Sequence, residues 1–219
     1  MSQVWSAMRV TLQISFLATL IVTALGGAIA YLLAKYRFPG RNLIETIITL
    51  PLVLPPTVVG FYLLVLFGRK GILGEPIFDA TGWSLILTWQ GAVLAATVMA
   101  LPIMIKTTRS ALESVNQGYL LAGYSLGLTE LQTLCSIWLP LAWRGISTGI
   151  ILSFARTLGE FGATLIIAGN IPGETQTLSL AIYDAVQIGD QNLAMILVLI
   201  LTAIATTAIM IVNFLGAHK

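Results

Sequence analysis

Five long apolar stretches determine what this chain of 219 residues can fold into. A helix needs roughly 20 apolar residues to cross the hydrocarbon core of a bilayer, which is about 30 Å thick. The stretches that reach this length are residues 12–34, 43–67, 84–105, 145–168 and 193–215. A hydrophobic content of 57% and a mean hydropathy of +0.93 agree with an integral membrane protein. We therefore predict an all-α fold: a polytopic membrane helix bundle with five transmembrane helices in a single domain, residues 1–219.

Lysine and arginine are distributed unevenly between the two sides of this predicted bundle. The richer side has Lys35, Arg37, Arg41, Lys106, Arg109, Arg144 and Lys219, and the poorer side has Arg9, Arg69 and Lys70. Cytoplasmic loops of membrane proteins are enriched in lysine and arginine. We therefore predict a multi-pass protein of the cytoplasmic (inner) membrane, with its N-terminus outside and its C-terminus in the cytoplasm.

The segment 107–143 is the largest part outside the predicted spans, and it is too small and too apolar for a soluble domain. We expect a pair of cytoplasmic helices, the first of which covers 111–127 and ends at Gly127, where glycine favours a left-handed C-cap. Thr129 and Gln132 have the spacing of a capping box for the second helix. Apolar residues recur at helical spacing along the first helix: Leu112, Val115, Tyr119, Ala122 and Leu126. This stripe either binds a partner or rests against the spans.

The second predicted span contains three prolines, in the sequence "LPLVLPPTVVG". Each proline removes a backbone donor and clashes with the preceding helical turn, so the helix must bend or break near Pro55 and Pro56. Broken backbone at membrane depth is tolerated where protein or a water-lined cavity surrounds it. We therefore place Pro55, Pro56 and this span in the interior of an assembly, with a kink that only improves packing as the alternative.

The fourth predicted span contains two charges, in the sequence "SFARTLGEFGATLIIAGN". Arg156 and Glu160 near mid-helix would each oppose insertion by roughly 2.5–3.5 kcal/mol. On a continuous helix they would share one face with other small and polar residues, which should look into a polar cavity or a helix interface. The candidate site residues in this span are Ser153, Arg156, Thr157, Glu160 and Thr164. An ion pair with a purely structural role is the alternative, and the glycines of "GEFG" permit local unwinding.

The sequence also limits the chemistry that the chain can perform. It contains no G-x-x-x-x-G-K-[ST] phosphate loop, so we expect no nucleotide site on this chain. If the protein uses energy, that energy must come from another subunit. Cys135 is the single cysteine and His218 the single histidine, which supports neither a metal site nor a Cys/His nucleophile pair. A net charge of +2 does not indicate a nucleic-acid partner. We predict a protein that is no enzyme and binds neither cofactor nor metal.

Residues 121–140, "LAGYSLGLTELQTLCSIWLP", resemble the E-A-A-x(3)-G-x(9)-I-x-L-P signature of permease subunits of bacterial ATP-binding-cassette importers. The residues that fall on this signature are Leu121, Ala122, Gly123, Gly127, Ile137, Leu139 and Pro140. Leu121 replaces the glutamate of the signature, and Gly123 replaces its second alanine. The resemblance implies that the helix ending at Gly127 is a coupling helix that docks on a separate ATPase subunit.

Three further blocks resemble molybdate permease subunits, including "FARTLGEFGATLIIAGNIPGETQT". The "LGEFGA" part is shared with sulfate permeases, whereas "NIPGETQT" favours molybdate or tungstate. The resemblance implies a homodimer, two cytoplasmic ATPase subunits that hold ATP and magnesium, and a periplasmic oxyanion-binding protein docking on segments 69–82 and 170–191. The expected function is ATP-driven import of molybdate or tungstate. The candidates for its translocation path are Ser153, Arg156, Thr157, Glu160, Thr164, Pro55 and Pro56. The alternatives are a sulfate/thiosulfate permease subunit, a stand-alone ion-coupled carrier and a scaffold protein.

Overall fold

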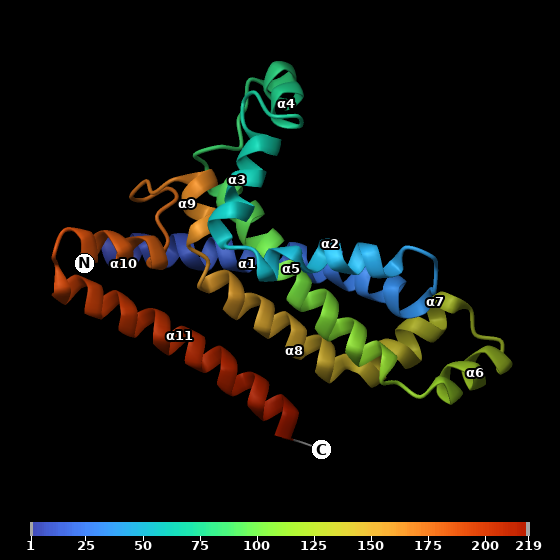
Figure 1. Ribbon diagram of the computed structural model, residues 1–219. Helices are drawn as coiled ribbons and strands as arrows, with labels where there is room; N and C mark the ends of the chain where they lie inside the picture. Colours follow the sequence, from blue (N-terminus) through green and yellow to red (C-terminus); the bar gives the residue numbers. More distant parts are fainter. Residues whose placement is uncertain (1, 218–219) are drawn as a thin grey trace.

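The computed structural model describes residues 2–217, and these residues form helices and their connections, without a β-strand. The all-α prediction is confirmed. His218 and Lys219, which the sequence analysis used, lie outside the described residues. Figure 1 shows an elongated body in which α1 runs along most of the length. The helices α6 and α7 lie at one end of this body, and α10 lies with the N-terminus at the other.

The centre of the bundle is formed by α1 (Ser2–Lys35) and α5 (Trp89–Glu113). Small residues let their backbones approach closely, as is common between membrane helices. Ala18 of α1 and Ala92 and Ala96 of α5 are fully buried in the largest core cluster. The next long helix, α8 (Leu139–Leu158), packs on α5 at Gly149, where a Cβ atom would lie 3.3 Å from Met104.

The second predicted span, 43–67, is two helices. The first, α2 (Arg41–Val53), and the second, α3 (Pro56–Phe67), meet at an angle of 116°. Pro55 precedes α3 in an extended conformation, and Pro56 occupies its first turn, where a missing N–H is harmless. The predicted break is therefore confirmed. Its size exceeds a kink, because α3 and the short helix α4 (Gly74–Thr81) project away from the body (Figure 1).

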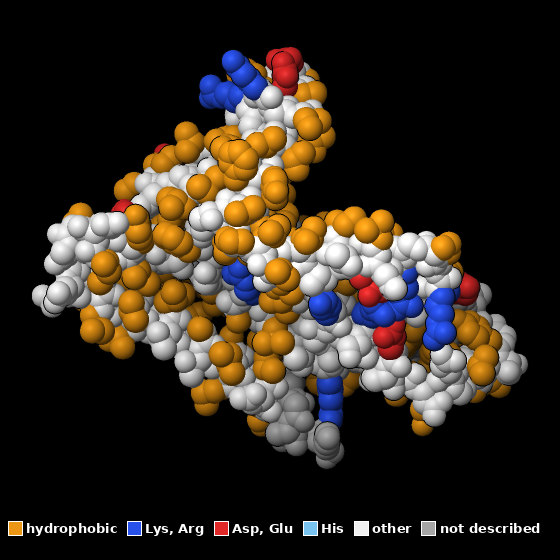
Figure 2. Space-filling model, viewed as in Figure 1, with side chains coloured by type: hydrophobic (Ala, Val, Ile, Leu, Met, Phe, Trp, Pro, Cys, Tyr) orange, Lys and Arg blue, Asp and Glu red, His pale blue; other side chains and the backbone are white. Residues whose placement is uncertain are grey.

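Four helices are long and apolar enough to cross a membrane, and counting the bent pair α2–α3 as one span gives five. They are α1, α5, α11 (Gln191–Ala217) and a continuous helical stretch from Glu130 to Leu158. The helix α11 packs on α8 and α10 along one side, and most of its side chains are exposed. Figure 2 shows apolar side chains over the body, with many charged groups near α4 and near the start of α2.

Two local predictions differ from the structure, and a further helix lies in the segment 170–191. The predicted span 145–168 is interrupted, because α8 ends at Leu158 and α9 (Gly162–Ala168) begins after a break. The predicted helix 111–127 is also interrupted, because Asn116 caps the new helix α6 (Gln117–Ser125) through its side chain. The segment 170–191 contains a helix, α10 (Leu178–Gln187), which is capped by Thr177 and held by a hydrogen bond from the Leu178 N–H to Thr11.

Candidate functional site: the coupling segment and two helix breaks

The predicted turn of the inner segment is present. Gly127 has a φ of 84°, a left-handed conformation that glycine adopts without steric cost. Two residues later Thr129 caps α7 (Glu130–Thr133), and its side chain and that of Gln132 form the reciprocal bonds of a capping box. We call residues 114–138 the coupling segment. Its helices α6 and α7 form a hairpin at the end of the bundle (Figure 1).

The surface of α6 is unusually apolar. Tyr119, Leu121, Tyr124 and Leu126 are exposed, with Leu126 retaining 83% of its accessible surface. Ala122 is exposed as well, so the middle of α6 has no cover within the described residues. An exposed apolar patch of this kind marks an interaction site.

The predicted apolar stripe is divided between two helices. Leu112 is buried at the end of α5, in a cluster that includes Val115, and these two residues do rest against the spans. Tyr119, Ala122 and Leu126 do not, because α6 begins anew after Asn116 and turns outward. The first part of the stripe therefore rests against the spans, and the second part is free to bind a partner.

The second half of the signature forms the junction with the membrane helices. Ile137 lies in a π-helical turn, η1 (Leu134–Trp138), and packs against Gly123, where a Cβ atom would come within 2.7 Å of its Cδ1. Gly123 therefore permits the close approach of α6 and η1. Leu139 and Pro140 begin α8 and are exposed. The structure thus brings Gly123 and Ile137 together and leaves Leu121, Ala122, Leu139 and Pro140 at the surface.

The two charges of the fourth predicted span meet at the break between α8 and α9. Arg156 Nη1 lies 2.8 Å from Glu160 Oε2, and Glu160 Oε1 accepts a hydrogen bond of 2.9 Å from the Ala163 N–H. Glu160 is buried at 2% exposure, while the Arg156 side chain keeps 25%. The Oε2 atom has this ion-pair contact but no aligned hydrogen bond among the described residues. The Glu160 carboxylate therefore binds both the first turn of α9 and the Arg156 guanidinium.

The remaining polar candidates of this span are also buried. Ser153, Thr157 and Thr164 are nearly inaccessible. Thr157 donates to the Phe154 carbonyl at 2.7 Å, whereas the Ser153 hydroxyl has no partner among residues 2–217. The predicted continuous face through Thr164 is wrong, because the helix ends at Leu158. Within α8, this face forms a helix interface with α5 at Gly149.

The breaks of the two interrupted spans lie against each other. A Cβ atom on Gly162 would lie 3.0 Å from the Pro56 Cβ and 3.2 Å from the Thr57 nitrogen. Farther along the same contact, a Cβ on Gly60 would come within 2.8 Å of the Ala163 Cα. The first turns of α3 and α9 are therefore in direct contact. Pro56 and Glu160, which are far apart in the sequence, lie on the two sides of one junction.

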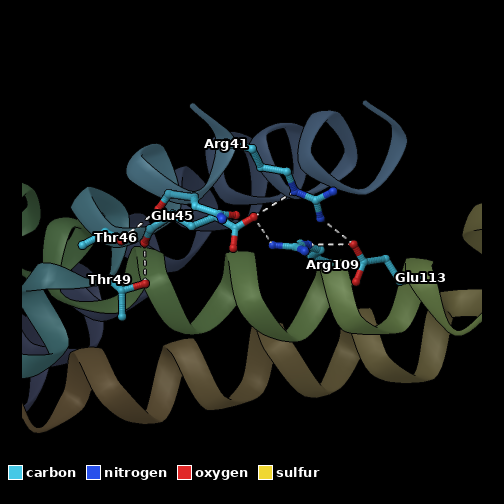
Figure 3. A network of polar contacts seen from close by, with 7 residues as sticks. Arg41, Glu45, Thr46, Thr49, Arg109 and Glu113 are labelled. Atoms are coloured by element: carbon cyan, nitrogen blue, oxygen red, sulfur yellow. Dashed lines mark hydrogen bonds and ion pairs between the residues drawn. The ribbon is translucent and has the colours of Figure 1, made fainter. Parts of the chain in front are cut away.

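Sequence analysis missed a ring of four charges between α2 and α5 (Figure 3). Arg41 contacts Glu45 at 2.9 Å and Glu113 at 2.8 Å. Arg109 contacts Glu113 at 2.8 Å and also pairs with Glu45. Each charge therefore has two opposite neighbours. The signal was present in the sequence, because "RNLIE" and "RSALE" both place arginine and glutamate four residues apart.

Comparison with known proteins identifies the family. Residues 6–218 match the family described as "Binding-protein-dependent transport system inner membrane component". The chain belongs to this family. It is accordingly a multi-pass inner-membrane permease subunit and not itself an ATPase, and the nucleotide binds to the ATPase partner, as the sequence analysis expected. Neither a stand-alone carrier nor a scaffold protein fits this family, whose members work with ATPase and binding-protein partners.

The sequences of individual permeases align with nearly the whole chain. The molybdenum transport system permease protein ModB of Escherichia coli K12 is 42% identical over 97% of this chain and 93% of its own length. The sulfate transport system permease protein CysT of Escherichia coli K12 is 35% identical over 99% of this chain and 78% of its own length. The permease is thus similar to permease proteins of both a molybdenum and a sulfate transport system.

Solved structures have the same fold. A chain of the inward-facing MetNI methionine ABC transporter matches with a TM-score of 0.76 at 18% identity, covering 100% of this permease and 97% of that chain. A chain of the bacterial alginate ABC transporter in complex with a pentasaccharide-bound periplasmic protein also gives 0.76, at 15% identity over 97% and 77%. At these identities the similarity supports the fold alone.

Proposed function

We propose that this permease is the membrane subunit of an ATP-driven importer of molybdate, with tungstate as a close alternative. The observation that carries the proposal is the 42% identity to the Escherichia coli ModB protein along almost the full length of both chains. Sulfate or thiosulfate is the second candidate, since CysT is 35% identical over a similar span. The sequence "NIPGETQT", residues 170–177, resembles molybdate permeases and favours the first substrate.

The assembly that fits this function contains two copies of the permease, two cytoplasmic ATPase subunits and one periplasmic oxyanion-binding protein. The exposed apolar surface of α6 supports ATPase docking, because it has no cover within the described chain. Leu121, Ala122, Gly127, Leu139 and Pro140 are the proposed docking and turn residues, and Gly123 and Ile137 hold the docking helix in place. The binding protein would dock on segments 69–82 and 170–191.

The proposed topology has the N-terminus outside and the C-terminus in the cytoplasm. The lysine and arginine distribution supports it, because the connection from α1 to α2, which holds Lys35, Arg37 and Arg41, lies at the same end of the bundle as α6 and α7 (Figure 1), and Lys35 pairs with Glu130 of α7. The opposite end contains α10 and the start of α1. ATPase docking on α6 requires the same orientation.

The translocation path is proposed to run beside the junction of the two breaks. Arg156 lies beside this junction and remains partly accessible, so it can attract a divalent oxyanion. Its pairing with buried Glu160 offsets part of that charge, so the ion is not held too tightly to leave. Ser153, Thr157 and Thr164 would supply hydroxyl groups, and Pro55 and Pro56 the bend, when the buried face opens.

Uptake by cells that lack this chain tests the proposal. Restoring the chain together with its transport partners should restore uptake of labelled molybdate at nanomolar concentration, and of tungstate to a similar extent. Sulfate uptake is the matched control. Restored sulfate uptake without any effect on molybdate or tungstate would replace the molybdate assignment by the sulfate alternative.

A further inference from the structure

The last turn of α5 is held from two sides. On one side the Trp138 indole N–H donates a hydrogen bond of 2.8 Å to the Leu112 carbonyl oxygen. On the other side the neighbouring residue, Glu113, binds Arg41 at 2.8 Å. Two adjacent residues of α5 therefore join the coupling segment to α2.

Trp138 is well suited to transmit a displacement. It is 8% exposed, and its ring lies edge-on to Tyr31 of α1 at a centroid distance of 5.6 Å. It is the last residue of the π-turn η1. Ile137 of this turn packs on α6 through Gly123, while Trp138 packs on the opposite side against α1 and α5. A π-turn inside an α-helix often marks a functional position.

The ring of four charges ties the position of α2 to that of α5. None of the residues of α2 is buried, so packing alone holds this helix weakly. The ring of Arg41, Glu45, Arg109 and Glu113 links its first turns to the end of α5 through two of its contacts, Arg41 with Glu113 and Arg109 with Glu45 (Figure 3). A network in which every charge has two partners holds its geometry better than an isolated surface pair.

Beyond the ring, α2 leads to the junction of the two breaks. It ends at Val53, two residues before Pro55, and α3 then contacts Gly162 of the α8–α9 break. We infer that Trp138 and Arg41 are positioning residues that carry movement of the coupling segment through the last turn of α5 to α2 and this junction. The inference rests on the proposed function, because it needs an ATPase that moves α6.

The test measures oxyanion transported per ATP hydrolysed, in the complete complex reconstituted with its ATPase and binding protein. Trp138→Phe keeps an aromatic ring but removes the N–H donor, and Arg41→Gln opens the ring of charges. We expect each to lower the ratio by about two- to thirtyfold while ATP hydrolysis continues. Because both act on one route, the double variant should lose little more than the worse single variant.

Matched controls are exposed residues of α8. Trp143→Phe removes an indole N–H from an exposed tryptophan, and Arg144→Gln removes an arginine that lies near the Trp143 ring. Both should keep the wild-type ratio. Should Arg41→Gln fail to assemble, Glu113→Gln opens the same ring with little change in size. A purely structural role of Trp138 and Arg41 would lower the yield of complex and leave the ratio per assembled complex unchanged.

The outcomes separate the inference from the proposed function. The ratio is measured with whichever of molybdate, tungstate and sulfate the wild-type complex transports. A wild-type complex that transports only sulfate contradicts the molybdate assignment and leaves the coupling test intact. A wild-type ratio in Trp138→Phe, or losses that multiply in the double variant, would overturn the inference.

Discussion

Arg156 and Glu160 form an ion pair across a helix break: Arg156 belongs to the last turn of α8, and Glu160 lies in the connection that follows. The carboxylate also accepts the Ala163 N–H of α9, so one buried glutamate joins both helices. The positive end of the α9 backbone and the guanidinium both favour its charge. The pair therefore has a structural function in this conformation.

We predict that the two charges are strongly coupled in stability. Arg156→Leu should destabilise the assembled complex by about 3 kcal/mol, because it leaves a buried carboxylate without its cation. Adding Glu160→Gln should recover most of this loss, since the amide oxygen still accepts from Ala163 and no charge remains. Thermal unfolding of the single and double variants measures the coupling. Strictly additive effects would indicate that the two side chains act in separate environments.

Gly127 is predicted to be essential for transfer of force from the ATPase. Gly127→Val penalises the φ of 84° and should misplace α6, so that retention of the ATPase subunit and stimulated ATP hydrolysis both fall. Gly82→Val is the matched control, because Gly82 also has a positive φ, of 69°, and an open Cβ position, but caps α4. Equal ATPase retention in both variants would contradict the prediction.

The local parts of this fold were predictable from sequence. The capping box at Thr129, the left-handed Gly127 and the break at Pro55–Pro56 depend on residues within a few positions of each other. The cap that starts α6 at Asn116 was equally local but was overlooked, because the apolar stripe continued through it.

The parts that were missed depend on distant contacts. The ring joins Arg41 to Glu113, 72 residues away, and the Trp138 hydrogen bond spans 26 residues. Local spacing showed each i, i+4 pair of the ring but not that the two pairs meet. The start of helix α10 is similarly fixed by a distant contact, because the Leu178 N–H donates to the hydroxyl of Thr11, which is 167 residues away in the sequence. The 116° angle between α2 and α3 brings α3 against α9, a distant contact that the spacing of the prolines does not specify.

Contact between the two breaks gives a prediction about Gly60. Gly60→Ala places a methyl group within 2.8 Å of the Ala163 backbone, which cannot move as a flexible side chain would. We expect a loss of about 1–3 kcal/mol in stability of the complex from overpacking. Gly27→Ala on α1 is the control, since no atom lies within 4 Å of its Cβ position. If both variants unfold at the wild-type temperature, α3 and α9 are not tightly packed in the complex.

A variant of Ser153 can distinguish a structural role of this residue from a role in transport. Its hydroxyl is completely buried and has no hydrogen-bond partner among the described residues, an arrangement that opposes folding by about 1–3 kcal/mol. Ser153→Ala removes the unpaired group with little change in volume, so the stability of the complex should stay the same or rise. If the hydroxyl binds the oxyanion when the buried face opens, the same variant should nevertheless reduce molybdate uptake severalfold at unchanged abundance.

Thr157→Val is the comparison, because the Thr157 hydroxyl is already bound to the Phe154 carbonyl and its loss should affect stability at least as much as uptake. Full uptake by a stable Ser153→Ala complex would remove Ser153 from the proposed path, leaving Arg156 as the polar group of this face that is partly accessible.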